Sequence, residues 1–209
     1  MVFVVLLLTT YPLTFLGFIY IEIVKSSSGL KLYNSLCGAT IDEKYLGSIA
    51  NKESMMKIID QIDEVRGKSD IIEGSADEGW FIPPTLVLKP PLESKISNQE
   101  TFGPVITVQP FKDDFESIKL ANITGYGLSA SIFGSDAKRM KFISRRIKTG
   151  SICINDVKTH YGIADLPFGG IGKSGIGKVH GKEGIRAFSN QKAYLDNRIL
   201  FKSELWWFN

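Results

Sequence analysis

The sequence predicts an α/β protein with a sheet of the parallel type. Strand patterns at Val105–Phe111, Leu128–Phe133 and Ser151–Val157 alternate with helix patterns and are joined by short links. This alternation is typical of parallel strands connected by crossover helices. With 209 residues, 44% hydrophobic and 22% charged, the chain has ordinary globular composition and is long enough to bury its own core.

The N-terminal segment, residues 1–21, contains no charged side chain. As a helix it would reach roughly 30 Å, enough to span a bilayer. Three interpretations remain open: a membrane anchor, two buried core strands around Pro12, or a signal peptide. The β-branched and aromatic residues favour strands, and the lack of a preceding Lys or Arg argues against a signal peptide. The Gly/Ser break Lys25–Gly29 ends this first segment, which we define as residues 1–25.

The next part of the chain predicts one helix and one extended segment. Between residues 41 and 67, apolar side chains recur every three or four positions, as on one face of a helix. They are Met55, Ile58, Ile59, Ile62 and Val65. A polar stretch over residues 68–79 follows. Trp80–Leu88 then reads as extended chain, and Pro83-Pro84 within it requires a kink or a sheet edge.

Two further helices are predicted between the strands. Asp113 or Asp114 can cap a short helix that ends near Asn122. Asp136 can cap another, which Gly150 ends. The apolar stripe predicted for this second helix is Met140, Ile143 and Ile147.

Composition excludes several kinds of function. A net charge of +3 is too small to indicate a nucleic-acid-binding protein. With two cysteines and two histidines in the chain, neither a disulfide framework nor a His- or Cys-based metal site is expected. Cys153 lies within an apolar strand pattern, where a thiol is usually inert. His160 stands beside Tyr161 and is either a pocket-lining or a surface histidine.

The glycine-rich segment Pro167–Gly184 imitates two nucleotide-binding motifs. Gly170, Gly172 and Gly175 fit G-x-G-x-x-G, but no strand precedes them and too little chain follows for a βαβ unit. A phosphate-binding loop would need a glycine where Pro167 stands. The glycines therefore indicate either a structural turn or a close approach of backbone to another group.

A second cluster, Glu100–Pro104, stands immediately before a predicted buried strand. Ligands of α/β proteins bind at strand ends. A carboxylate can accept hydrogen bonds from the vicinal hydroxyls of a ribose, and an aromatic ring can pack on a flat ligand. A solvated glutamate at a helix end is the alternative.

Five ordered segments together resemble one family. They are WFIPPTLVL, NQETFGPVITVQPF, ANITGYGLSASIF, TGSICIND and LPFGGIGKSGIGKVHGKEGIRAFS. In this order and spacing they are similar to the C-terminal part of the NAD(P)-dependent aldehyde dehydrogenase superfamily, from about Gly38 to Lys192. The resemblance implies a three-layer α/β catalytic domain over residues 26–190 and an oligomerisation arm over residues 191–209.

The resemblance also implies roles for individual residues. Glu100 matches the glutamate that binds the nicotinamide ribose, and Phe102 matches the aromatic that packs on this end of NAD or NADP. Asn155 and Phe168 match positions that shape the substrate tunnel wall, and Phe168 also supports the cofactor-facing loop. An aldehyde substrate, a homo-oligomer and a cytoplasmic location are implied as well.

The family's catalytic cysteine has no match here. In the family, a cysteine thiolate attacks the aldehyde, hydride passes to NAD(P), and a glutamate-activated water releases the acid. The position expected for that cysteine falls in MVFVV, and Cys37 lies in a different family segment. We therefore assign no catalytic residue to this chain. It is expected to be a fragment that is inactive alone; the alternatives are a subunit that completes a split enzyme and a membrane-anchored, non-enzymatic module.

Three origins remain open for the unusual start of the chain. A frame disruption, an internal start within a split gene and a genuine anchor joined to half an enzyme each explain why residues 1–21 do not resemble the family. The first two fit a missing N-terminal half. The third fits the anchored module.

Overall fold

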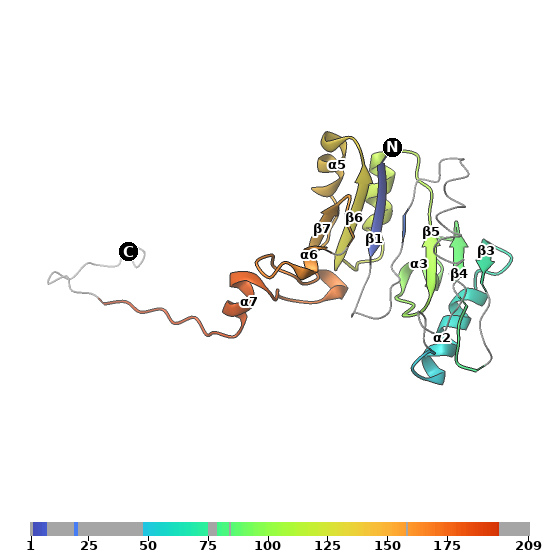
Figure 1. Ribbon diagram of the computed structural model, residues 1–209, viewed down its shortest axis with the longest axis horizontal. Coiled ribbons are helices and arrows are strands. Elements are labelled where there is room, and N and C mark those ends of the chain that lie inside the picture. The colour runs from blue at the N-terminus through green and yellow to red at the C-terminus, as the bar shows by residue number, and fades with distance from the viewer. Residues whose placement is uncertain are drawn as a thin grey trace, which may run out of the picture.

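A computed structural model describes residues 2–7, 19–20, 48–74, 79–83, 85–157 and 159–196, and only the backbone of residues 2–7 and 19–20. Seven strands form a single sheet in the order β3-β4-β5-β2-β1-β6-β7, with helices packed against it (Figure 1). The strands are β1 (Val2–Leu7), β2 (Ile19–Tyr20), β3 (Asp70–Glu73), β4 (Thr85–Leu88), β5 (Val105–Val108), β6 (Ser129–Gly134) and β7 (Ser151–Ile154). The helices are α2 (Lys52–Asp63), α3 (Lys95–Asn98), α4 (Asp114–Ala121), α5 (Ala137–Ser144), α6 (Thr159–Gly162) and α7 (Gly181–Ala187).

The α/β class predicted from the sequence is confirmed, and the sheet is mixed. β4, β5 and β2 run parallel, as do β6 and β7. β1 lies between β2 and β6 and is antiparallel to both, and β3 is an antiparallel edge strand. Eleven residues separate β1 from β2, a connection that suits antiparallel neighbours better than a parallel pair with its crossover helix.

Of the three interpretations of residues 1–21, the described residues match the pair of core strands. β1 pairs with β6 over six positions, from Val2 with Gly134 to Leu7 with Ser129. β2 pairs with β1 on one side and with β5 on the other. Both strands are therefore internal to the sheet. In the part of the chain that the structure describes, no helix is long and apolar enough to cross a membrane.

The predicted helix caps are present. Asp113 Oδ1 accepts a hydrogen bond from the backbone N–H of Glu116 at 2.9 Å, and Asp136 Oδ1 accepts one from Arg139 at 3.0 Å. Asn51 caps α2 in the same way, at 2.8 Å from Ser54 N. Each cap satisfies a backbone donor that the helix itself leaves unpaired.

Two hydrophobic clusters hold the helices on the sheet. The first joins β6 to α4 and α5 and contains the predicted stripe Met140, Ile143 and Ile147. The second joins β4 and β5 to α2 and α3 and contains Ile58, Ile62 and Val65 of the predicted α2 face. Helical periodicity therefore identified core residues in both clusters.

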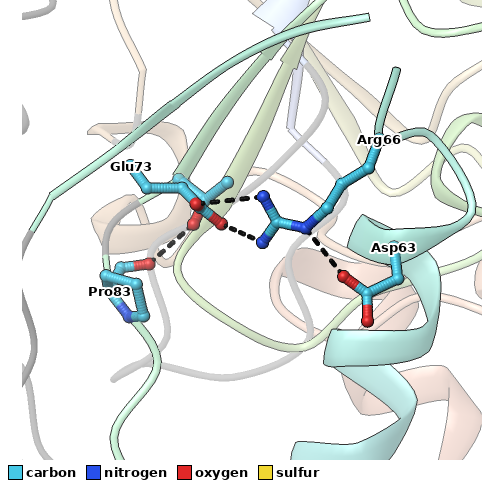
Figure 2. A network of polar contacts seen from close by, with 5 residues as sticks. Asp63, Arg66, Glu73 and Pro83 are labelled. Carbon is cyan, nitrogen blue, oxygen red and sulfur yellow. Dashed lines mark hydrogen bonds and ion pairs between the residues drawn. The ribbon is translucent and has the colours of Figure 1, made fainter. Parts of the chain in front are cut away.

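The polar stretch over residues 68–79 contains a strand that its sequence did not predict. β3 is held by Arg66, whose guanidinium donates to both carboxylate oxygens of Glu73, at 3.2 and 2.7 Å, and to Asp63 at 2.8 Å (Figure 2). Beside this network, Thr85 donates to the carbonyl of Pro83. A strand pairing therefore formed where polarity predicted only a loop.

The C-terminal part of the described chain leads away from the sheet (Figure 1). After α7, residues 189–196 have no regular secondary structure. The oligomerisation arm over residues 191–209 stays a prediction, because residues 197–209 lie outside the described part. Cys37 lies outside it too.

Candidate functional site

The structure brings the two sequence clusters to the same edge of the sheet. Glu100–Pro104 precedes β5, and the glycine-rich loop contacts the residues that precede β6 and β7: Gly127 O accepts from Ile171 N and from Gly150 N, each at 3.0 Å. The strand register makes β5, β6 and β7 run in one direction. Their amino ends therefore share one edge, although the clusters are far apart in the sequence.

Glu100 lies half-buried at this edge, two residues beyond α3. Burial raises the pKa of its carboxyl above the ordinary value, and the charge of Lys57 opposes this shift. The carboxylate makes no hydrogen bond to any other described residue, and its two oxygens can accept hydrogen bonds from a ligand.

Phe102 is held in a strained turn beside Glu100. Its φ of 52° is left-handed, a conformation that costs an aromatic residue energy and is kept only where the surroundings impose it. The next residue, Gly103, packs closely on α2, since a Cβ added there would come 2.6 Å from Ile58 Cδ1. Phe102 itself is 49% exposed, which suits a ring that packs on a ligand.

The glycine-rich loop makes the close backbone approach that its composition predicts. A Cβ on Gly150 would lie 1.8 Å from Gly169 O, and one on Gly170 would lie 2.2 Å from Ser174 O. The ammonium of Lys178 donates to Gly169 O, and Ser174 Oγ accepts from Gly127 N at 3.0 Å. The loop forms a short 3-10 turn, Gly172–Ser174, rather than the strand–helix junction of a dinucleotide fingerprint.

Phe168 lies at the start of this loop among other aromatic rings. Its backbone exchanges two 2.7 Å hydrogen bonds with Val179. Its ring centroid lies 4.9 Å from Tyr161, edge to face, 5.7 Å from His160 and 6.1 Å from His180. We call Phe168, Tyr161, His160 and His180 the aromatic cluster.

One member of the aromatic cluster contacts a cysteine: Cys153 Sγ lies 2.9 Å from His160 Nδ1. Cys153 is 6% exposed, as expected for a strand thiol. His160 is half-buried. Burial raises the pKa of the thiol and lowers the pKa of the imidazole.

Asn155 stands at the carboxyl end of β7 and joins it to β6. Its Oδ1 accepts from Gly134 N at 2.8 Å, and its Nδ2 donates to Gly134 O at 2.9 Å. Its φ of 52° is a left-handed conformation that asparagine tolerates well. The amide is thus engaged by backbone, and its place in a substrate wall stays a prediction.

Sequence reasoning missed three residues of this region. His180, Tyr161 and Lys178 converge on Phe168 and its loop only through the fold. The one local signal was the glycine density around them, which predicts close packing without saying of which groups. Among the described residues, no group of three or more His, Cys, Asp or Glu side chains could hold a metal ion.

The comparisons with known proteins fit this arrangement. The model of the "Aldehyde dehydrogenase family" matches residues 29–194. The chain belongs to the aldehyde dehydrogenase family. A family 3 aldehyde dehydrogenase of Arabidopsis thaliana is 34% identical over 156 residues, which are 74% of this chain and 32% of the relative. A 4,4'-diapolycopene aldehyde oxidase of a Methylomonas species is 42% identical over 54% of this chain and 22% of its own length.

Solved structures of aldehyde dehydrogenases share the fold. The Mycobacterium tuberculosis aldehyde dehydrogenase complexed with NAD+ superposes with a TM-score of 0.64 at 29% identity, over 71% of this chain and 31% of that one. The fold is thus that of the aldehyde dehydrogenase catalytic domain, and the NAD+ in that neighbour agrees with the predicted cofactor. The chain spans about a third or less of the length of these relatives.

Proposed function

We propose that this chain supplies the C-terminal part of the catalytic domain of an NAD(P)-dependent aldehyde dehydrogenase that oxidises an aldehyde to a carboxylic acid. The observation that carries the proposal is the placement of Glu100–Pro104 and the glycine-rich loop at the same edge of the sheet. In this role the chain forms the cofactor-facing wall of the active site. The family resemblance adds a cytoplasmic homo-oligomer to the proposal.

The residues at this edge fit the nicotinamide end of NAD(P). Glu100 offers a half-buried carboxylate that makes no hydrogen bond to the described residues and can accept hydrogen bonds from ribose hydroxyls. Phe102 offers an exposed ring that can pack on the flat base. When bound, NAD(P) would accept the hydride that leaves the substrate. The part of these two residues is to bind and orient.

The described residues offer no nucleophile for the aldehyde. Cys153 is the one cysteine among them, and burial holds its pKa high, so it remains a thiol at neutral pH. Cys153 also lies inside β7 and contacts His160 of the aromatic cluster. The purified chain is therefore expected to form no NAD(P)H from any aldehyde. Turnover by the chain alone that disappears with Glu100→Gln would contradict this.

A second chain that carries the family's nucleophile and cofactor domain should restore activity. We would co-express this chain with the part of the Arabidopsis relative that precedes the matched region, then test for a complex and for NADH formation. In an active complex, Glu100→Gln should raise KM for NAD+, and the exposed Glu93→Gln should leave it unchanged. Failure of the two parts to co-purify would count against the split-enzyme interpretation. Equal KM values for both variants would reject the role of Glu100.

A further inference from the structure

The contact between Cys153 and His160 is not used in the proposed chemistry, yet it joins β7 to a member of the aromatic cluster. The sulfur and Nδ1 are 2.9 Å apart. The other ring nitrogen of His160, Nε2, is buried and has no hydrogen-bond partner among the described residues. Within the described part of the chain, the thiol is therefore the polar group that holds the imidazole ring in place.

The backbone that carries His160 is fixed separately. Asp156 accepts hydrogen bonds from Thr159 N at 3.0 Å and from Thr159 Oγ1 at 2.6 Å, which ties the start of α6 to the turn after β7. This anchor sets where α6 begins but not how the His160 ring is turned. The orientation of the ring depends on Cys153 and on the neighbouring rings.

His160 transmits its orientation to Phe168. The two rings are 5.7 Å apart and inclined by 39°, and Tyr161 and His180 contact Phe168 as well. The backbone of Phe168 is paired with Val179. Its phenyl ring has no hydrogen-bonding group, so packing holds the ring in place. A His160 ring that turns would leave a gap beside Phe168, and close-packed side chains move to fill such gaps.

Both partners are uncharged near neutral pH, because burial raises the pKa of Cys153 and lowers the pKa of His160. The thiol can donate to Nδ1 or accept from an Nδ1–H, so the contact is compatible with either neutral tautomer. In both cases the short contact between Sγ and Nδ1 fixes the plane of the His160 ring.

We propose that Cys153 is a positioning residue: its hydrogen bond to His160 fixes the place of the Phe168 ring. That this ring belongs to the wall facing cofactor and substrate rests on the proposed function. The positioning itself is a property of the described chain and can be tested without any activity.

The first test is NMR of the full chain with isotope-labelled histidine and phenylalanine. In the wild type, His160 and Phe168 should each show one set of ring signals. Cys153→Ala should shift and broaden the ring signals of His160 and shift those of Phe168, whereas Cys153→Ser, which keeps a hydrogen-bonding group, should restore both. Val87→Ala, a buried truncation in the second hydrophobic cluster, is the matched control for lost packing and should shift neither.

Two outcomes would overturn the proposal. Unchanged His160 and Phe168 signals in Cys153→Ala would show that the thiol does not hold the ring. A serine variant as perturbed as the alanine variant would show that the sulfur acts by its volume and not through a hydrogen bond.

The second test uses the complemented enzyme. Cys153→Ala should raise KM for NAD+ or aldehyde about fivefold, the factor for about 1 kcal/mol, with kcat unchanged and serine restoring it. If the NMR changes appear without any change in KM, the positioning stands and the placement of Phe168 in the proposed wall is rejected. If neither appears, the positioning fails while the proposed role of Glu100 is untouched.

Discussion

Replacing Gly150 by alanine tests the close contact between β7 and the glycine-rich loop. The added Cβ would lie 1.8 Å from Gly169 O, and real Cβ atoms essentially never approach below 3.0 Å. The difference, 3.0 − 1.8 = 1.2 Å, is the least distance by which the two backbones must separate. Such a shift would also strain the hydrogen bond from Lys178 to Gly169 O and the pairing of Phe168 with Val179.

We expect Gly150→Ala to lower the free energy of unfolding by about 3 kcal/mol, the upper end of ordinary overpacking costs, because backbone and not a flexible side chain must move. With a urea m-value of about 2 kcal/mol/M, the unfolding midpoint would fall by about 1.5 M. Gly162→Ala in α6 is the control, since nothing lies within 4 Å of its added Cβ. It should be neutral or stabilising by up to about 1 kcal/mol.

The same urea titration can refute the predicted contact between Gly150 and the glycine-rich loop. If Gly150→Ala unfolds within about 0.5 kcal/mol of the wild type, the range of a neutral surface change, the loop is not packed against β7 as described. Equal destabilisation by Gly162→Ala would show that alanine itself, and not the contact, is responsible.

Three further predictions concern single side chains. Asn155→Ala should cost about 1–3 kcal/mol in urea unfolding, since it strips the Gly134 backbone of its partners, and Asn155→Gly should recover only the backbone strain. Glu100 binds its proton more tightly when folded than when unfolded, because burial raises its pKa above 4.5; its ionisation therefore weakens the fold as pH rises above that value. Glu100→Gln should accordingly stabilise more at pH 7 than at pH 4, and equal effects would contradict the burial. Arg66→Met should cost about 0.5–1 kcal/mol through loss of the Glu73 and Asp63 pairs, and less in high salt; the same cost in 1 M salt would contradict an electrostatic origin.

Local patterns located most elements correctly. The stripe of Ile58, Ile62 and Val65 and that of Met140, Ile143 and Ile147 are buried where helical periodicity placed them. The caps at Asp113 and Asp136 begin the helices that they predicted. These features succeed because spacing along a helix and capping depend on residues a few positions apart.

The sequence missed elements whose cause lies elsewhere in the chain. β3 lies in a polar stretch, and it forms through its pairing with β4 and the contact of Glu73 with Arg66. α7 begins among glycines that predicted a turn or a close backbone approach and no helix. In both places tertiary contacts outweigh local preference.

By itself, the sequence determined the α/β class, the core faces of the helices and the family, because each depends on local order along the chain. Only the tertiary structure decided that residues 2–7 and 19–20 are internal strands, that Glu100–Pro104 shares a sheet edge with the glycine-rich loop, and that His160 bonds to Cys153. Strand register and ring contacts join residues that are distant in sequence. No periodicity records such pairings, so they follow from the packing of the whole sheet.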